Sequence, residues 1–299
     1  LGALGCAIDE VGGCKVVVLE ATSTLPFTWV ERPVAGVNDG WRAVTFGNNL
    51  FVAVGESGDR VMTSPDGITW TVRSAALNDD AWRGVTFGNG LFVAVGEGGN
   101  DRIMTSPDGI TWTPRSAALN DDAWQSVAYG NGRFVAVGGG TSGDHAIYSL
   151  DNGVTWTTWT VNPEISNNDS WQSVAYAAGL FVAVSASGDH VMTSPDGNIW
   201  TRRFAVGDDD NWQGLAYGNG IFVAVGNDQD RVMTSPDGIT WTLRSGAGDN
   251  DGWQSIAYGG GYFVAVSNSG DRVMTSPDGI TWTPRYAEGN NDDWQGVAY

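Results

Sequence analysis

Short runs of β-branched and aromatic residues, separated by turns rich in Gly, Asn and Asp, recur along the chain. In the stretch that begins at Trp82, four such runs predict strands at residues 82–87, 91–95, 102–106 and 111–115. Three turns separate them, at residues 88–90, 96–101 and 107–109. No segment has helical periodicity over ten or more residues. The pattern therefore predicts an all-β chain of four-stranded antiparallel units.

A tryptophan opens each unit. It begins the pattern Trp-(Arg/Gln)-x-(Val/Leu/Ile)-(Ala/Thr)-(Tyr/Phe), and the openings follow one another at 41, 42, 47, 41, 41 and 41 residues. Four-stranded units at this period are typical of β-propeller blades. The repeats start at Trp41, Trp82, Trp124, Trp171, Trp212, Trp253 and Trp294.

The two ends of the chain predict how the ring closes. The seventh opening strand, residues 294–299, is followed by no further strand, whereas residues 1–33 can supply the three that are missing. Pairing the two ends would remove exposed sheet edges. We therefore expect residues 1–299 to form a single seven-bladed β-propeller of four-stranded antiparallel blades. N- and C-terminal strands share its seventh blade, made of residues 1–33 plus 294–299.

A second marker, Ser-Pro-Asp-Gly-Ile-Thr-Trp, first occurs at residues 64–70 and returns once in each repeat with small changes. Pro fixes its own φ, Asp can accept hydrogen bonds from nearby backbone amides, and Gly adopts positive φ at little cost. We expect a tight hairpin turn, with the following Trp folded over it. The aspartates assigned to this structural turn are Asp66, Asp108, Asp151, Asp196, Asp237 and Asp278.

The copy at residues 149–156, Ser-Leu-Asp-Asn-Gly-Val-Thr-Trp, carries a resemblance to a known family. It is similar to the Asp box of sialidase-like and other β-propellers, and the remaining copies resemble versions one residue shorter. The resemblance implies a propeller in which the Asp box is a structural turn at the blade periphery. It implies little about activity, because the motif occurs in enzymes and non-enzymes alike.

Charge narrows the range of partners. The net charge is −19, from 34 acidic and 15 basic residues. This balance disfavours nucleic acid and anionic membranes, which need a basic patch, and favours cations, basic proteins or neutral ligands. No apolar run is long enough to span a membrane. The chain begins at Leu1, without an initiator Met, which predicts a processed or trimmed chain.

Alternating strand directions would gather an acidic loop from every repeat on one face of the ring. Clustered Asp and Asn oxygens suit Ca²⁺, although Asx turns that cap the strand entry explain the same residues without a metal, and we expect no other cofactor. An insertion at residues 159–168 adds Trp159, which either contacts a ligand or covers a strand edge. The candidate ligand or cation face comprises Asp39, Asp80, Asp122, Asp169, Asp210, Asp251, Asp293 and Trp159.

Two cysteines, Cys6 and Cys14, lie eight positions apart in the first predicted strands. A pair this close could bridge a hairpin, and a disulfide would indicate an oxidising compartment outside the cytoplasm. The alternative is two buried thiols.

These observations predict a non-catalytic extracellular or cell-surface propeller. It would act as a multivalent module that binds glycans or other surface proteins, or that assembles with itself. The alternative is a sialidase-like glycoside hydrolase, which would need a non-repeating cluster of carboxylates and Arg at the axial opening. A third reading is an assembly factor resembling the photosystem II assembly propellers. The acidic balance and the lack of an evident Arg patch count against it.

Overall fold

The computed structural model of the chain describes most of the sequence. The described residues are 4–8, 14–20, 28–33, 40–57, 60–76, 81–98, 102–118, 123–139, 146–159, 165, 169–187, 190–206, 211–227, 231–247, 252–268, 272–286 and 293–299. Only the backbone is described for the strands before residue 34 and for residues 190, 272, 286 and 293. This part of the chain contains 28 strands and no helix, in agreement with the all-β prediction.

Six sheets are each built from four consecutive strands, and we call them blades 1 to 6 in chain order. Blades 1 to 3 comprise β4 (Trp41–Gly47), β5 (Leu50–Gly55), β6 (Arg60–Ser64) and β7 (Thr71–Ser74); β8 (Ala81–Gly88), β9 (Leu91–Glu97), β10 (Ile103–Ser106) and β11 (Thr113–Arg115); and β12 (Ala123–Gly130), β13 (Arg133–Gly139), β14 (Ala146–Ser149) and β15 (Thr157–Thr158). Blades 4 to 6 comprise β16 (Trp171–Ala177), β17 (Leu180–Ser185), β18 (His190–Ser194) and β19 (Thr201–Phe204); β20 (Trp212–Gly218), β21 (Ile221–Gly226), β22 (Arg231–Ser235) and β23 (Thr242–Ser245); and β24 (Trp253–Gly259), β25 (Tyr262–Ser267), β26 (Arg272–Ser276) and β27 (Thr283–Tyr286).

One further four-stranded sheet joins the two ends of the chain, and we call it the closing sheet. Its strand order is β28-β1-β2-β3, with β1 at Leu4–Ile8, β2 at Cys14–Glu20, β3 at Thr28–Pro33 and β28 at Asp293–Ala298. The antiparallel register of β1 with β28 runs from Leu4 opposite Ala298 to Ile8 opposite Asp293. The C-terminal strand is therefore held by the N-terminal one.

The structure corrects the prediction of a seven-bladed propeller. Six blades are built from consecutive strands, and each contains a Ser-x-Asp turn with its hydrogen bonds. The closing sheet differs from them because it combines strands from opposite ends of the sequence. Residues 21–27, between β2 and β3, lie outside the described residues. The molecule is accordingly six repeat-built blades and the closing sheet.

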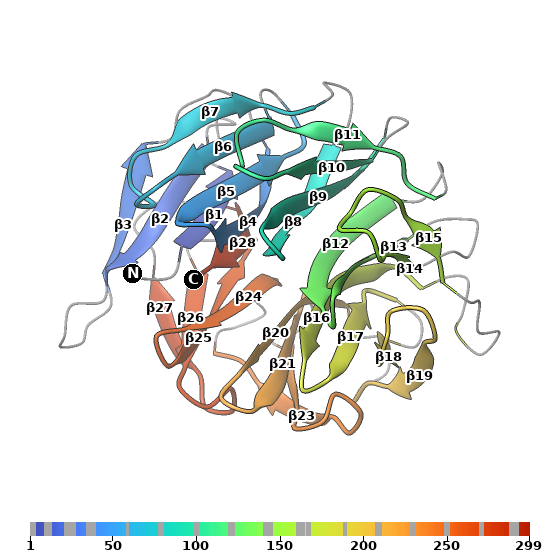
Figure 1. The fold of residues 1–299 in the computed structure, drawn as a ribbon. Helices are drawn as coiled ribbons and strands as arrows, with labels where there is room; N and C mark the ends of the chain where they lie inside the picture. The colour runs from blue at the N-terminus through green and yellow to red at the C-terminus, as the bar shows by residue number, and fades with distance from the viewer. Residues whose placement is uncertain are drawn as a thin grey trace.

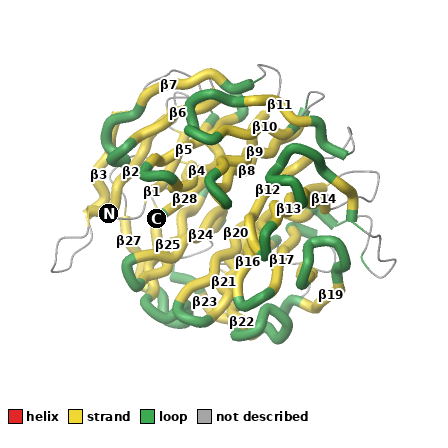
Figure 2. Tube along the Cα trace, viewed as in Figure 1, coloured by secondary structure: helices red, strands yellow, loops and turns green. Residues whose placement is uncertain are grey.

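The sheets surround a central axis, with the first strand of each blade on the inside and the fourth on the outside (Figures 1 and 2). The closing sheet lies between blade 6 and blade 1, with β28 innermost (Figure 1). This arrangement brings the openings of all the repeats together around the axis.

The fourth strands are shorter than predicted. The run at residues 111–115 was expected to be a strand, but β11 begins only at Thr113. The reason is the turn itself, because the backbone N–H groups of Ile110 and Thr111 donate to Asp108 Oδ1, both at 2.8 Å. Those amides are therefore committed to the turn and cannot pair with β10.

Tryptophans fill the interior, two in each of the six blades. The opening tryptophans, such as Trp41 and Trp82, are 0% exposed. The tryptophans that follow the turns are also buried, and the indole N–H of Trp70 donates to the carbonyl of Gly67 at 3.0 Å. A buried indole removes about 150–250 Å² from water, so these side chains supply much of the hydrophobic stabilisation of the ring.

Candidate functional site: the axial cavity

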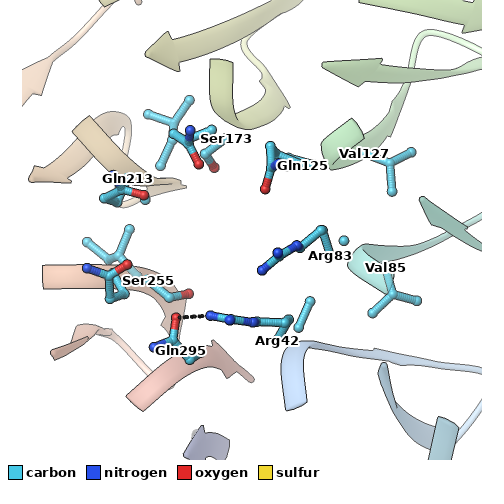
Figure 3. Close-up of a pocket in the computed structure, with 17 residues that line it drawn as sticks. Arg42, Arg83, Val85, Gln125, Val127, Ser173, Gln213, Ser255 and Gln295 are labelled. Atoms are coloured by element: carbon cyan, nitrogen blue, oxygen red, sulfur yellow. Dashed lines mark hydrogen bonds between the residues drawn. The ribbon is translucent and has the colours of Figure 1, made fainter. Parts of the chain in front are cut away.

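A cavity of about 160 Å³ lies on the axis, where the first strands of the blades meet (Figure 3). The residue that follows the opening tryptophan lines it in every repeat. We call this set the axial ring: Arg42, Arg83, Gln125, Gln172, Gln213, Gln254 and Gln295. Two arginines and five glutamines thus surround one small space.

A β-bulge places each side chain of the axial ring. In blade 1, Trp41 pairs with Gly55 and Ala43 pairs with Val54, so Arg42 is the extra residue between two successive pairs. A bulged residue is unpaired and its side chain can be redirected. The register shifts at the same point in the other blades and in β28. The bulge therefore directs one side chain of every repeat, an arginine or a glutamine, toward the axis.

The two charged residues that line the cavity, Arg42 and Arg83, both pair with glutamates that are not part of its lining. Arg42 donates through Nε and Nη2 to Glu56 Oε2 and Oε1, at 2.9 and 2.8 Å. Arg83 Nη1 lies 2.9 Å from Glu56 Oε2, and its Nη2 donates to Glu97 Oε1. Figure 3 shows both arginines extending toward the middle of the cavity. The two guanidinium groups and two carboxylates form one network whose formal charges cancel.

Glutamines extend this network at both ends. Arg42 Nη1 donates to Gln295 Oε1 at 3.0 Å (Figure 3). At the other end, Gln125 Nε2 lies 3.4 Å from Glu97 Oε2. The charged network thus runs from the closing sheet through blades 1 and 2 to blade 3.

The arginines keep Glu56 ionised. Burial alone would raise the pKa of Glu56, but the hydrogen bond and charge of Arg42, together with the charge of Arg83, outweigh it and lower the pKa below its usual value. A carboxyl group with a lowered pKa does not carry a proton at neutral pH. Glu56 is therefore unsuited to act as a general acid.

The remaining sector, from blades 4 to 6, is uncharged. Here the glutamine amide groups donate back to the loop residue two positions earlier: Gln172 Nε2 to Ser170 Oγ at 2.9 Å, Gln213 Nε2 to Asn211 Oδ1, and Gln254 Nε2 to the carbonyl of Gly252 at 3.4 Å. The amide oxygens of the three glutamines are left without a protein donor among the described residues, so they are available to a ligand.

Most of the predicted acidic face lies outside the described residues. This holds for Asp39, Asp80, Asp122, Asp210 and Asp251, and only the backbone of Asp293 is described. The binding of a ligand or of Ca²⁺ by this face stays a prediction. Within the part of the chain that the structure describes, no three His, Cys, Asp or Glu side chains lie together in a way that could hold a metal ion.

Asp169 and Trp159, the other two members of the predicted face, are buried. Their exposed fractions are 2% and 4%. Trp159 packs with Ile165 and Trp171, and its backbone N–H donates to the carbonyl of Ala146 at 3.1 Å. The backbone bond continues the pairing of β15 with β14, and a ligand contact by Trp159 stays a prediction.

Five of the six Asp-box turns share one hydrogen-bond pattern, and in the longer turn of blade 3 Asp151 instead accepts from the backbone N–H and the hydroxyl of Thr155. In blade 5, Asp237 Oδ1 accepts from Ser235 Oγ at 3.0 Å and from the backbone N–H groups of Ile239 and Thr240, both at 2.8 Å. The bonds from Thr240 and then Ile239 lower the pKa of Asp237. The pKa values of the other five turn aspartates, Asp66, Asp108, Asp151, Asp196 and Asp278, are lowered as well.

The two cysteines lie in adjacent strands. In the backbone register Cys6 is opposite Val16 and Cys14 is opposite Ile8, so the cysteines do not face each other directly. Their side chains are outside the described set, and the disulfide stays a prediction. No helix among the described residues is long and apolar enough to cross a membrane.

The axial ring was missed in the sequence, although its signal is visible there. The Trp-(Arg/Gln) pair indicates where each repeat begins. The type of the second residue does not show that a bulge redirects its side chain. The charged sector also has a signal: Glu56 directly follows β5 and Glu97 ends β9, where blades 5 and 6 have Asn227 and Asn268.

No known protein family matches the chain, and no curated protein matches it. Several solved structures are similar to the chain. A streptogramin B lyase has a TM-score of 0.79 at 10% identity, covering 89% of each chain. YCF48 from Cyanidioschyzon merolae has a TM-score of 0.60 at 16% identity, covering 83% of this chain and 85% of its own. A nidogen/laminin complex gives 0.57 at 9% identity, covering 99% and 97%.

At these identities the similarity shows a β-propeller fold and nothing further. It also corrects the resemblance to sialidase-like propellers. Propellers of the streptogramin B lyase and YCF48 kinds are among those that match over most of the chain. The short Asp-box motif indicated the fold class because it forms a local turn, and a local turn does not define the superfamily around it.

Proposed function

We propose that this propeller is a non-catalytic binding module, located outside the cell or on its surface, which needs no cofactor. The proposal is supported by the pairing of the charged groups at the axial cavity. All four charged groups there are paired with one another. Glu56 is held ionised between two arginines. Such a site can recognise a ligand, and Glu56 is not a carboxylic acid ready to donate a proton.

A glycoside hydrolase is the alternative, and one observation favours it. Arg42, Arg83, Glu56 and Glu97 form a non-repeating cluster of arginines and carboxylates at the axis, as such an enzyme requires. Hydrolysis by two carboxyl groups, however, needs one of them protonated by a raised pKa. The pKa of Glu56 moves in the opposite direction. The cluster is better explained as an ion-pair network that shapes a binding site.

The periphery supports multivalent contacts. The aliphatic residue after the turn glycine is solvent-exposed in five blades: Ile68, Ile110, Val154, Ile239 and Ile280, between 40% and 49% exposed. Equivalent side chains repeated around a rigid ring favour avidity for a repetitive partner, such as a glycan surface or further copies of the protein.

A glycan array read together with sedimentation of the purified protein tests the proposal. We expect either binding to glycans or concentration-dependent self-association, and no turnover of activated glycosides. Turnover that is lost in Glu56→Gln and in Glu97→Gln would show that the protein is a hydrolase. Adding Ca²⁺ during a thermal melt tests the acidic face, because a cation bound to the native state raises Tm.

A further inference from the structure

The fourth strands of five blades contain an arginine that is fixed in the same way. In blade 1, Arg73 Nε donates to Thr63 Oγ1 at 3.0 Å, and Thr63 is 2% exposed. Four further blades repeat the bond at 3.0 or 3.1 Å: Arg115 to Thr105, Arg203 to Thr193, Arg244 to Thr234 and Arg285 to Thr275. A buried hydroxyl therefore sets the orientation of each guanidinium group.

In four of these arginines the two terminal nitrogens have no partner among the described residues. Arg285 makes a further interaction, so we restrict the name junction arginines to Arg73, Arg115, Arg203 and Arg244. All four are partly exposed, and none forms an ion pair within the part of the chain that the structure describes. With Nε bonded to threonine, the edge formed by Nη1 and Nη2 is left, and its two donors match the two oxygens of one carboxylate.

The junction arginines lie on the side of their blade that faces the next one. In the antiparallel register Arg73 is opposite Val61, so both side chains are on the same face of the sheet. Val61 belongs to the same buried cluster as Trp82 of blade 2. In blade 3, Trp159 takes the corresponding position, three residues after the turn tryptophan, and it packs with Trp171 of blade 4. The arginines are therefore placed where the outer parts of two blades meet.

The Asp-box turn of the next blade borders each of these positions. A Cβ added to Gly153 in blade 3 would lie 3.3 Å from Cγ2 of Thr105, the threonine that holds Arg115. At the other three junctions the turn glycine meets the valine that pairs with the holding threonine. An added Cβ would lie 2.7 or 2.8 Å from a valine Cγ2, for Gly109 with Val52, Gly238 with Val182 and Gly279 with Val223.

Two further features recur at these four junctions. An exposed threonine pairs with the threonine that holds the arginine: Thr71, Thr113, Thr201 and Thr242. The turn of the next blade adds an aliphatic side chain directly after its glycine, between 40% and 49% exposed: Ile110, Val154, Ile239 and Ile280. A pair of charged donors, a hydroxyl and an apolar side chain are thus presented together by adjoining strands and turns.

We propose that the outer blade junctions bind the uronic-acid units of an acidic polysaccharide, with each carboxylate accepting from Nη1 and Nη2 of a junction arginine. A uronic acid carries a carboxylate, hydroxyls and an apolar C–H face on one ring, and each junction offers a partner for all three. A polymer with one carboxylate per unit meets several equivalent sites, which raises avidity. The inference rests on the proposed glycan-binding function and names the class of glycan.

The net charge of −19 opposes such a ligand at long range. At physiological ionic strength, charges separated by more than about 8 Å are largely screened, whereas a guanidinium group and a carboxylate interact at hydrogen-bond distance. Nonspecific attraction to this chain would favour a cationic polymer. Binding of an anionic polysaccharide must therefore come from local contacts.

Isothermal titration calorimetry at about 0.15 M NaCl is the test. We expect polygalacturonate to bind and dextran, a neutral polysaccharide, not to bind. Equal binding of dextran would overturn the inference, because the arginines would then have no part in recognition. Absence of polygalacturonate binding would overturn it as well, including the case in which dextran sulfate alone binds. Poly-L-glutamate that binds as tightly as polygalacturonate would refute the assignment to a sugar, because it offers carboxylates without the ring.

The number of sites locates them. Trigalacturonate should saturate at four sites per chain, one for each junction arginine. Arg244→Gln should reduce the number to three and leave the remaining affinity unchanged, a result that impaired folding does not produce. Arg231→Gln is the matched control, because it removes the same charge from β22 of the same blade. Equal effects of the two substitutions would reduce binding to net charge and refute the assignment.

Replacing all four junction arginines separates geometry from charge. The fourfold lysine variant keeps the charges and loses the planar pair of donors, so we expect polygalacturonate to bind about tenfold more weakly. The fourfold glutamine variant should not bind it, and unchanged affinity in either variant counts against the sites. Binding of neutral glycans or self-association without polygalacturonate binding would refute this inference and leave the proposed function intact. Glycoside turnover would refute the proposed function itself.

Discussion

In five of the six Asp-box turns the described hydrogen bonds all go to one carboxylate oxygen, whereas Asp151 uses both. Asp237 Oδ1 accepts one bond from the hydroxyl of Ser235 and two from backbone amides. Replacing Asp237 by Ala leaves these donors without that acceptor, and we expect a loss of about 1–3 kcal/mol in the free energy of unfolding, measured by urea denaturation. Asp237→Asn keeps an oxygen acceptor and should lose less. Equal losses in the two variants would mean that the hydrogen bonds do not stabilise the turn.

The same hydrogen bonds make the free energy of unfolding depend on pH. The backbone N–H groups of Thr240 and Ile239 lower the pKa of Asp237 in the folded state. The stabilisation is therefore complete above the unfolded pKa of about 3.9 and is lost as pH falls through the lower folded pKa. We expect the difference in unfolding free energy between the natural protein and Asp237→Asn to shrink from pH 7 to about pH 3. A constant difference would contradict this linkage.

The Asp-box residues could be predicted from the sequence, and the axial ring could not. An aspartate two residues before a backbone donor makes a local bond, so Ser-Pro-Asp-Gly specifies its own turn. The axial position of Arg42 depends on a bulge against β5 and on the convergence of the inner strands. Neither is encoded within a few neighbouring residues. The excess of acidic residues likewise drew attention to the loops, whereas the described charged cluster is balanced.

Neighbouring blades interlock where an aromatic ring of one blade covers a glycine of the preceding one. A Cβ added to Gly88, at the end of β8, would lie 2.1 Å from Cγ of Tyr129 in β12. That atom is at the base of the ring, so the clash cannot be relieved by rotation of a flexible tip. We infer that glycine is required here to let the two inner strands approach.

Gly88→Ala is therefore expected to cost about 3 kcal/mol of unfolding free energy, since overpacking forces strands apart. Gly90 is the matched control, because it has φ of +77° and no atom within 4 Å of an added Cβ. We expect Gly90→Ala to lose only about 1 kcal/mol of unfolding free energy, because the substitution strains the backbone conformation and meets no neighbouring atom. Urea denaturation of both variants measures the difference, and similar losses would show that blade spacing does not depend on Gly88.

At the scale of the molecule, the closing sheet connects the end of the chain to its beginning. Strand β28 pairs with β1. Tyr299, which directly follows β28, packs against blade 6, since a Cβ added to Gly259 would lie 1.8 Å from Cγ of Tyr299. Trp294 is 1% exposed. Hydrogen bonds to β1 and packing against blade 6 together connect the end of the chain to the ring, and β28 covers the edge of β1.

Deleting residues 293–299 should therefore reopen the ring. We expect a lower Tm and concentration-dependent association on size exclusion, because the edge of β1 becomes available to another chain. A synthetic peptide of residues 293–299 added in trans should restore Tm by binding the native state. The same peptide with Trp294→Ala should fail, since it lacks the indole that is buried in the intact protein. If the shortened chain melts at the same temperature as the natural one, the ring does not depend on its closing strand, and each blade must be stable through its neighbours alone.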